Sequence, residues 1–422
     1  MSTSGASKPM QKVIRLIRKS RKPLSEIFCA ARFSPRLQTR LLVLQATPFC
    51  NLDCDYCYLP DRQNPARMTL ETVRLCASRL VEDGLVGPRL TVVWHAGEPL
   101  VLSPDYYEEA FGTLAQVLGP DCDISHSFQT NGTLIDERWC RFFSRHPVRV
   151  GVSVDGPADL HDAHRRTRRG DGTHDRVIAG IERLREHGIP FHAIAVIGHA
   201  ALARAADLRD FFVAEGVQEV GFNFDEVEGD HLSSSLQHHE SEHLAFLSET
   251  FALSARSAGR YRVREFVTAL NSIAHEPASY EYDGRRWPEN SQVIPFAIIS
   301  VAWNGDFSTF SPEFLGQRNA MYGDFILGNL ASAGYLAAAG DQPFARLWSD
   351  ILSGVVACEA NCAYFKYCGG GAPVNKLYEN GSLASAETLY CRTMIKRPLE
   401  AALLALESAA SVPGGTSPVG SC

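Results

Sequence analysis

Short apolar runs alternate with amphipathic stretches along residues 41–230 of the chain. Six runs have the length and the β-branched or aromatic content of buried strands. They are LLVLQAT (41–47), LTVVWHA (90–96), ISHSFQTN (124–131), VRVGVSVDG (148–156), FHAIAVIG (191–198) and EVGFNFDEV (219–227). Amphipathic stretches between them (69–84, 175–188 and 205–216) end in glycine, as helices often do. This alternation predicts parallel strands joined by right-handed crossovers, in a barrel or an open part-barrel.

Polar motifs follow four of the predicted strands. Three cysteines come after the first strand, HAGEP after the second and QTNG after the third, while SVDG lies on the fourth. In parallel α/β folds the chemistry is found at the carboxyl ends of the strands. The four motifs therefore fall where the active site of such a fold is expected.

The sequence beyond residue 230 has a different character. The polar segment DHLSSSLQHHESEH (230–243) predicts a loop that leads into a helix. Its histidines His238, His239 and His243 could bind a metal, but a solvated histidine-rich loop is the commoner outcome. The stretch FAIISVAWNGDFSTF (296–310) predicts a hairpin with Asn-Gly at its turn.

Composition is typical of a globular protein, since 45% of the 422 residues are hydrophobic and 21% are charged. The net charge of -7 argues against general nucleic-acid binding. Residues 1–40 carry ten Lys or Arg and a single acidic residue, Glu26. This basic arm could contact an acidic peptide, a membrane surface or nucleic acid, and a solvated tail is the simpler interpretation. Because neither a signal peptide nor a run of about 18 apolar residues occurs, we expect a cytoplasmic protein without a membrane span.

Three of the twelve cysteines, Cys50, Cys54 and Cys57, lie on the loop after the first predicted strand. Three thiolates on one short loop can hold three irons of a [4Fe–4S] cluster and leave the fourth iron to a non-protein ligand. A zinc site whose fourth ligand lies elsewhere is the alternative. The aromatic residue Tyr56 before the last cysteine, together with the strand-end position, favours the iron–sulfur cluster.

At this point the chain resembles the radical S-adenosylmethionine (SAM) superfamily. The resemblance implies that the open iron chelates SAM, and that one electron from the reduced cluster splits SAM into methionine and a 5′-deoxyadenosyl radical. AGEP resembles the segment that receives the SAM ammonium group, with Ala96 in place of the family's first glycine. Arg165 matches an arginine that pairs with the SAM carboxylate. The SAM contacts implied in this way are Tyr56, Gly97, Glu98, Pro99, Thr130, Asn131, Ser153 and Arg165.

A second cysteine group has the spacing Cys358-x3-Cys362-x5-Cys368, followed by Cys391. Four thiols make a closed site, and a zinc knuckle would explain the pattern alone. The segment resembles the SPASM extension of peptide-modifying radical SAM enzymes, which holds auxiliary [4Fe–4S] clusters. It lacks the full set of seven cysteines, and Ala372 stands where another ligand is expected. The resemblance therefore implies one auxiliary cluster with four protein ligands, whose role is electron transfer.

The amino-acid sequence around these motifs resembles that of the GrrM/OscB-type maturases, which form cyclophanes in ribosomal peptides. The similar segments include LLVLQATPFCNLDCDYCYLPDR, VVWHAGEPLVL and YFKYCGGGAPVNK. The implied substrate is a glycine-rich precursor peptide, in which a Cβ radical adds to an aromatic ring. The implied partners are this peptide and an electron donor such as flavodoxin or ferredoxin, with no nucleic acid and no membrane.

The base that takes the ring proton is not identifiable from the sequence. Candidates are Asp225, Glu226, Glu228, Asp306 and Glu313, each of which is more commonly a surface or supporting carboxylate. Two other interpretations remain open. One is a different SPASM-type reaction, such as formylglycine generation in sulfatases or thioether formation, and the other is a non-catalytic iron–sulfur or zinc protein.

The expected fold is α/β: a partial (β/α)6 radical SAM barrel with a C-terminal SPASM-type auxiliary cluster domain. The division of the chain that we expect is a basic N-terminal arm (1–40), a radical SAM core (41–235), a helical linker region (236–295), a SPASM-like domain (296–400) and a helix end with a flexible tail (401–422).

Overall fold

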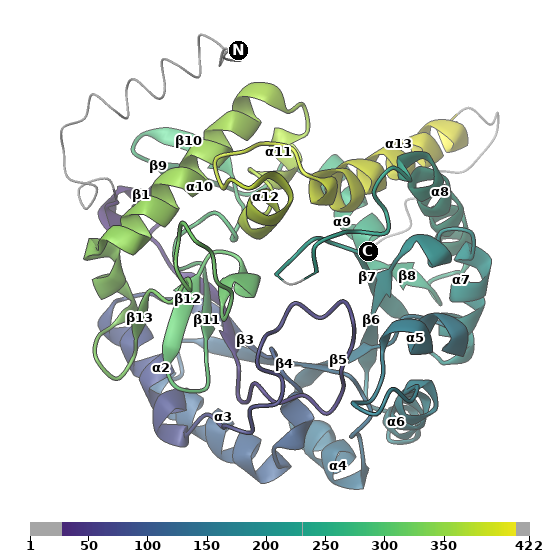
Figure 1. Cartoon of the computed structure of the whole chain (residues 1–422), viewed down its shortest axis with the longest axis horizontal. Coiled ribbons are helices and arrows are strands. Elements are labelled where there is room, and N and C mark those ends of the chain that lie inside the picture. Colours follow the sequence, from purple (N-terminus) through teal and green to yellow (C-terminus); the bar gives the residue numbers. More distant parts are fainter. Residues whose placement is uncertain (1–27, 230, 411–422) are drawn as a thin grey trace.

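A curved sheet with helices around its outside forms the core of the computed structural model, which describes residues 28–229 and 231–410 (Figure 1). The sheet has the order β13-β12-β11-β2-β3-β4-β5-β6-β7-β8. Its six central strands are parallel: β2 (Thr39–Leu44), β3 (Val86–Trp94), β4 (Asp123–Thr130), β5 (Val148–Ser153), β6 (Phe191–Ile197) and β7 (Glu219–Phe224). The expectation of a parallel part-barrel is therefore confirmed.

Helices between these strands cover the outer face of the sheet. They are α2 (Leu70–Glu82), α3 (Pro104–Leu118), α4 (Glu137–Arg145), α5 (Ala158–His164), α6 (His174–Glu186) and α7 (Ala205–Ala214), with short 3-10 turns η3 (Pro99–Val101) and η4 (His199–Ala201). Side chains cap several of them, since Thr69 accepts from the N–H of Thr72 and Asp136 from the N–H groups of Arg138 and Trp139. The strands thus hold their carboxyl ends, and the motifs that follow them, at one rim.

The C-terminal half extends the same sheet. The expected hairpin is present as β11 (Ile298–Val301) and β12 (Asp306–Thr309), joined by β13 (Gly328–Asn329). Strand β11 pairs in parallel with β2, from Ile298 opposite Leu41 to Val301 opposite Leu44. This long-range pairing places the second cysteine region beside the barrel, and the sequence pattern alone did not predict it.

Further elements close the molecule around this sheet. They are η2 (Ala30–Arg32), β1 (Phe33–Ser34), α8 (Glu240–Arg256), β8 (Arg262–Val263), α9 (Arg264–Ala274), β9 (Ser279–Tyr282), β10 (Arg285–Pro288), η5 (Pro312–Phe314), η6 (Tyr335–Gly340), α10 (Gln342–Asn361), α11 (Phe365–Cys368), α12 (Pro373–Asn380), the π-helix η7 (Cys391–Lys396) and α13 (Arg397–Ala410). Strands β1, β9 and β10 form a small separate sheet. Within the described ranges, no helix has the length and apolarity needed to cross a bilayer. Most of the basic arm and the flexible tail lie outside the described residues.

Candidate functional site

Two arginines stabilise the conformation of the loop that carries Cys50, Cys54 and Cys57, because they donate hydrogen bonds to its backbone carbonyls. The N–H of Cys50 donates to the carbonyl of Arg62 at 3.0 Å. The Arg62 guanidinium donates to the carbonyl of Cys54 at 3.0 Å and pairs with Asp53 at 3.0 Å. Arg168 donates to the carbonyl of Cys50 at 2.8 Å and also to that of Arg62. Two cations therefore fix the loop while leaving its three thiols available for a metal group.

The number of thiols on the loop bears on which metal group it could hold. A structural zinc site uses four protein ligands, whereas the loop offers the three thiols of Cys50, Cys54 and Cys57. Three thiols can each bind a different iron of a cubane and leave the fourth iron to a non-protein ligand.

Burial also acts on the thiols of the cysteine loop. It raises the pKa of the Cys50 thiol to about 12 and that of Cys54 to about 11. Metal coordination deprotonates a thiol outright, so a bound metal would supply the thiolate form that burial disfavours. The side-chain amide of Asn131 points at the Cys50 sulfur, with a nitrogen–sulfur distance of 3.8 Å. The chemistry of the donors therefore fits a [4Fe–4S] cluster.

Glu98 ties the ends of β3 and β4 together. Its carboxylate accepts hydrogen bonds from the N–H of Leu100 (3.0 Å), the hydroxyl of Thr130 (2.6 Å) and the N–H of Asn131 (2.8 Å). The residue is only 1% exposed, and burial raises its pKa to about 7. Pro99 begins the turn η3 directly after it. Gly97, Glu98, Pro99, Thr130 and Asn131, all expected from the sequence, thus lie in one contiguous group beside Cys50.

Asn131 joins this group to the cysteine loop. Its side-chain nitrogen donates to the side-chain oxygen of Asn51 at 2.8 Å, while its oxygen accepts from the N–H and hydroxyl of Thr133 at 3.0 and 2.7 Å. Asn51 in turn donates to the Thr133 hydroxyl at 2.9 Å. The closed ring of hydrogen bonds orients the amide that faces the Cys50 sulfur. Asn51 and Thr133 were not singled out from the sequence.

Tyr56 and Arg165 meet at a residue that the sequence analysis did not select, Asp155. Arg165 donates to both carboxylate oxygens of Asp155 at 2.9 and 3.0 Å, and Tyr56 donates its hydroxyl to the same carboxylate at 2.6 Å. The Arg165 guanidinium also lies over the Tyr56 ring, 5.4 Å from its centroid. One edge of the guanidinium is thus committed to Asp155. Asp155 belongs to the SVDG motif, from which only Ser153 was chosen; the Ser153 hydroxyl accepts from Gln129 at 2.9 Å.

The second cysteine group is assembled from three helices. Cys358 lies near the end of α10, Cys362 directly after it, Cys368 at the end of α11 and Cys391 at the start of η7. The Lys376 ammonium donates to the Cys358 sulfur at 3.2 Å, and the Thr388 hydroxyl donates to the Cys391 sulfur at 3.2 Å. Lys376 is only 2% exposed. A buried ammonium needs negative charge nearby, and a metal-bound set of thiolates supplies it.

Carboxylates lie between the two cysteine groups. Glu226 accepts from the side-chain amide of Asn375 at 2.9 Å. One carboxylate oxygen of Glu313 is buried without a hydrogen-bond partner among the described residues. Burial is the main reason that the pKa values of Glu226, Glu228 and Glu313 are all raised. Tyr58, the neighbour of Cys57, faces both Glu228 and Glu313, whose negative charges add to burial in raising its pKa.

The other two candidate bases have local structural roles. Asp225 accepts from the N–H of Ser235 at 2.6 Å and contacts His231 at 2.8 Å. Asp306 accepts from the side-chain amides of Asn304 at 2.7 Å and Asn329 at 2.8 Å, at the hairpin turn. Their oxygens are thus held by neighbouring donors, which leaves the three glutamates as the carboxylates of the central region.

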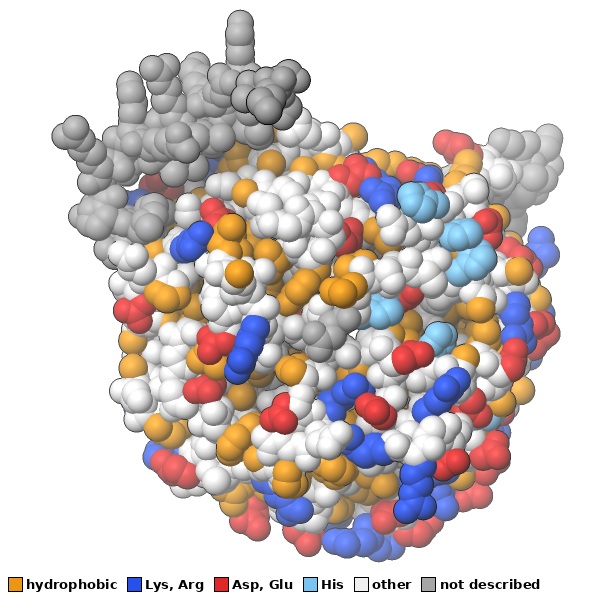
Figure 2. All heavy atoms as spheres, viewed as in Figure 1, with side chains coloured by type: hydrophobic (Ala, Val, Ile, Leu, Met, Phe, Trp, Pro, Cys, Tyr) orange, Lys and Arg blue, Asp and Glu red, His pale blue; other side chains and the backbone are white. Residues whose placement is uncertain are grey.

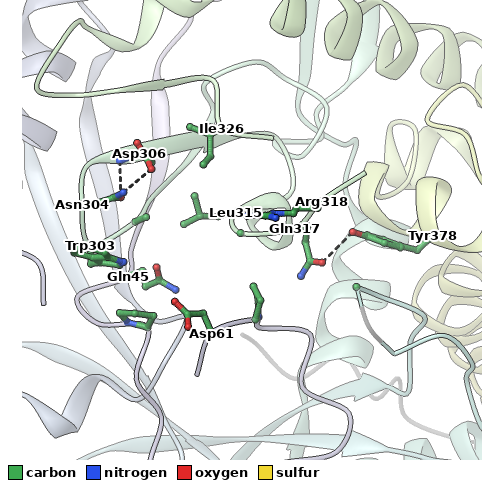
Figure 3. A pocket seen from close by; sticks show the side chains of 15 residues that line it. Gln45, Asp61, Trp303, Asn304, Asp306, Leu315, Gln317, Arg318, Ile326 and Tyr378 are labelled. Atoms are coloured by element: carbon green, nitrogen blue, oxygen red, sulfur yellow. Dashed lines mark hydrogen bonds between the residues drawn. The ribbon is translucent and has the colours of Figure 1, made fainter. Parts of the chain in front are cut away.

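A cavity of about 540 Å³ opens between the cysteine loop and the β11–β12 hairpin (Figure 3). Gln45 and Asp61 line one side of it, and Trp303 and Asn304 another. Gln317 also lines the cavity. Its side chain is held in place because it donates to the carbonyl of Tyr58 at 2.7 Å and accepts from the Tyr378 hydroxyl at 3.2 Å. Amide, carboxylate and aromatic groups in one cavity of this size suit a short segment of peptide.

Ala96 and Gly97 provide a matched pair of variants. Ala96 has a left-handed φ of 67°, and a Cβ at Gly97 would lie 2.1 Å from the carbonyl oxygen of Thr47. We expect Gly97→Ala to lower the free energy of unfolding by about 2–4 kcal/mol, because the backbone must move. Ala96→Gly should leave stability unchanged or raise it by about 1 kcal/mol, since it relieves strain at the cost of chain entropy. Denaturant unfolding of both variants checks this, and equal losses would contradict it.

Comparisons with known proteins bear on the family and the fold of the chain. The family model described as the radical SAM superfamily matches residues 44–211. An uncharacterized protein of Synechocystis sp. is 39% identical over 376 residues, which is 87% of this chain and 92% of the relative. The serine-type anaerobic sulfatase-maturating enzyme of Klebsiella aerogenes is 32% identical over 225 residues, so the match spans about half of each protein (53% and 52%).

Solved structures share the whole fold. Native anSMEcpe with bound AdoMet has a TM-score of 0.68 at 20% identity, covering 88% of this chain and 100% of that chain. SuiB of Streptococcus suis bound to its precursor peptide SuiA has a TM-score of 0.53 at 15% identity, covering 93% of this chain and 84% of that chain. These likenesses extend through the C-terminal half, in agreement with the expected barrel and SPASM-type extension.

Proposed function

The chain belongs to the radical SAM superfamily of enzymes, and on that basis we propose that it modifies a ribosomally made peptide by installing a carbon–carbon cyclophane crosslink. The observation that carries the proposal is the cavity between the cysteine loop and the hairpin, where Gln317 binds the carbonyl of Tyr58, the neighbour of Glu228 and Glu313. Two further observations support the proposal. The sequence around the motifs resembles that of cyclophane-forming maturases, and SuiB, a protein of the same fold, binds a precursor peptide.

Two cofactors are required, a [4Fe–4S] cluster and SAM, and together they supply a 5′-deoxyadenosyl radical that removes a hydrogen atom from a substrate carbon. The residues of the first site bind and orient them. Cys50, Cys54 and Cys57 would hold the cluster, and the Asn131 amide points at the Cys50 sulfur. Glu98 would receive the SAM ammonium and Arg165 the SAM carboxylate. Tyr56 and Ser153 would contact the nucleoside.

The second cysteine group holds an auxiliary [4Fe–4S] cluster with four protein ligands. The proposal is supported by the donor set and by two groups directed at its sulfurs, Lys376 and Thr388. Hydrogen bonds and charge near cluster thiolates tune the reduction potential. Lys376 holds a positive charge next to Cys358, which favours the reduced form of the bound group. An external donor such as flavodoxin or ferredoxin supplies the electrons.

The three glutamates accept the proton that crosslinking releases. Joining a ring carbon to a Cβ removes one hydrogen atom, one electron and one proton from the peptide. The radical would remove the hydrogen atom and the auxiliary site would accept the electron, which leaves the proton for a base of the protein. Glu226 is suited to this role because Asn375 fixes its position and its raised pKa matches a base that works near neutral pH.

Co-expression with a glycine-rich precursor peptide tests the proposal. We expect the peptide to lose the mass of two hydrogens, and fragmentation should locate the link between an aromatic residue and a nearby Cβ. The alternative, formylglycine formation in a sulfatase, is favoured by the 32% identity to sulfatase-maturating enzymes. A sulfatase peptide offered in parallel separates the two activities. An unchanged precursor beside a modified sulfatase peptide would reject the crosslinking function.

A further inference from the structure

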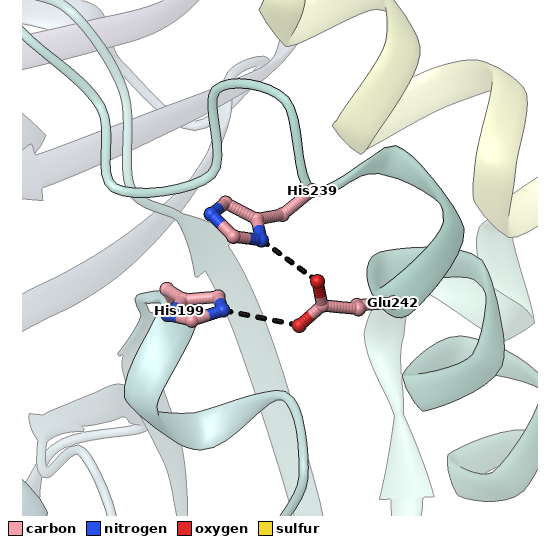
Figure 4. A group of neighbouring side chains, drawn as sticks. All are labelled: His199, His239 and Glu242. Atoms are coloured by element: carbon pink, nitrogen blue, oxygen red, sulfur yellow. Dashed lines mark hydrogen bonds and ion pairs between the residues drawn. The ribbon is translucent and has the colours of Figure 1, made fainter.

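Two histidines and a glutamate outside the radical SAM site converge from the turn after β6 and from the start of helix α8 (Figure 4). His199 begins η4 after strand β6, His239 precedes α8, and Glu242 lies in the first turn of α8. The Nε2 atom of His199 lies 3.0 Å from one carboxylate oxygen of Glu242, and the Nδ1 atom of His239 lies 2.8 Å from the other. The ligand atoms of all three lie within 4.8 Å of one another.

The backbone around these side chains is fixed by further contacts. The N–H of His199 donates to the Ser235 hydroxyl at 3.0 Å, and the N–H of Ser235 donates to Asp225 at 2.6 Å. The two imidazole rings lie with centroids 3.8 Å apart. Figure 2 shows histidine side chains gathered on this accessible face near α8. The ligand positions are therefore organised before any metal arrives.

The donor set has the composition that first-row transition metals prefer. Neutral imidazole nitrogens and one carboxylate carry a net charge of -1, which suits a divalent cation. His243, which the sequence places near His239, does not join this group: it is buried against Phe224, with ring centroids 4.2 Å apart.

We propose that His199, His239 and Glu242 form a binding site for a divalent transition metal ion of the zinc type, with water as the fourth ligand. The ion would join the end of β6 to the start of α8. Glu226 and Glu228 lie on the segment between β7 and α8, so the ion would fix the end of the segment that carries these two carboxylates. The site itself does not depend on which peptide reaction the enzyme performs.

Zinc titration of the fully cluster-loaded protein tests this site. After removal of loosely bound metal with EDTA, calorimetry with ZnCl₂ should give one more equivalent of bound zinc for the wild type than for His199→Ala or His239→Ala. His238→Asn is the matched control, because His238 neighbours the site with a left-handed φ of 71°, which asparagine tolerates, and it should keep the extra equivalent.

Two further readouts guard against binding elsewhere and against misfolding. X-ray absorption at the zinc edge should give only nitrogen and oxygen neighbours for the extra equivalent. Zinc at 100 times its Kd should stabilise the wild type and His238→Asn by about 2.7 kcal/mol, and His199→Ala not at all. Equal zinc stoichiometry in the wild type and both alanine variants, or sulfur scattering from the bound zinc, would overturn the proposal.

Discussion

Replacing Cys54 by serine is expected to reduce formation of 5′-deoxyadenosine by more than about 100-fold. Loss of a group that only hydrogen-bonds to a metal ligand already lowers metal affinity or activity by about 10–100-fold, and Cys54 is itself a proposed ligand. Cys54 lies in the buried loop that Arg62 and Arg168 fold, and a hydroxyl is a poor iron ligand there. The measurement is chromatography of the products after anaerobic reconstitution with dithionite and SAM. The number of iron atoms per chain should fall from about eight, for two [4Fe–4S] clusters, to about four, for the auxiliary cluster alone.

Cys29→Ser serves as the control, since Cys29 is a free cysteine outside both groups. It should keep its iron and its activity. The cluster assignment would fail if the wild-type protein, purified without oxygen and with Cys50, Cys54 and Cys57 intact, contained stoichiometric zinc and no cubane absorption. It would also fail if the serine variant cleaved SAM at the wild-type rate.

Glu226→Gln is expected to lower the rate of peptide crosslinking by about 10²–10⁴-fold while SAM cleavage continues, because only the proton acceptor is removed. Burial raises the pKa of Glu226 to about 8, the negative charges of Glu313 and Glu379 add to this shift, and hydrogen bonds with Asn375 and Glu228 oppose it. The basic form grows as the pH rises through this value. Crosslinking by the wild type should therefore increase between about pH 7 and pH 9, and the variant should lose this increase.

Asp306→Asn is the matched control for the carboxylate prediction. Asp306 lines the cavity, but the Asn304 and Asn329 amides hold its oxygens. It should leave the pH profile unchanged. A Glu226→Gln enzyme that crosslinks at the wild-type rate, or that retains the rise with pH, would show that the proton leaves by another route.

The sequence predicted those parts of the site that follow directly from strand ends. The cysteine loop, Glu98 and Asn131 lie where parallel strands finish, so local periodicity was enough to bring them together. The pairing of β11 with β2 depends on contacts between residues more than 250 positions apart, and no local pattern encodes it. Asp155 was missed although its motif was recognised, because its role depends on where Arg165 and Tyr56 point.

Long-range contacts also explain what the sequence left open. Glu226, Glu228 and Glu313 were among five candidate bases, and their raised pKa values arise from burial that only the folded chain creates. His199 lies forty positions from His239, so no local pattern indicated that the two would meet. No sequence pattern marks Arg62 and Arg168, because they bind backbone carbonyls, which every residue has.

The parallel pairing of β11 with β2 limits how the protein can be divided. A fragment that ends before residue 290 would leave those backbone N–H and C=O groups of β2 that face β11 without partners, while the pairing with β3 remains. Leu42 and Leu44 are fully buried in the intact chain, so the same cut removes cover from apolar side chains. An unprotected apolar edge strand is a template for aggregation. A truncated barrel should therefore be recovered mainly as insoluble material, however complete its cysteine loop.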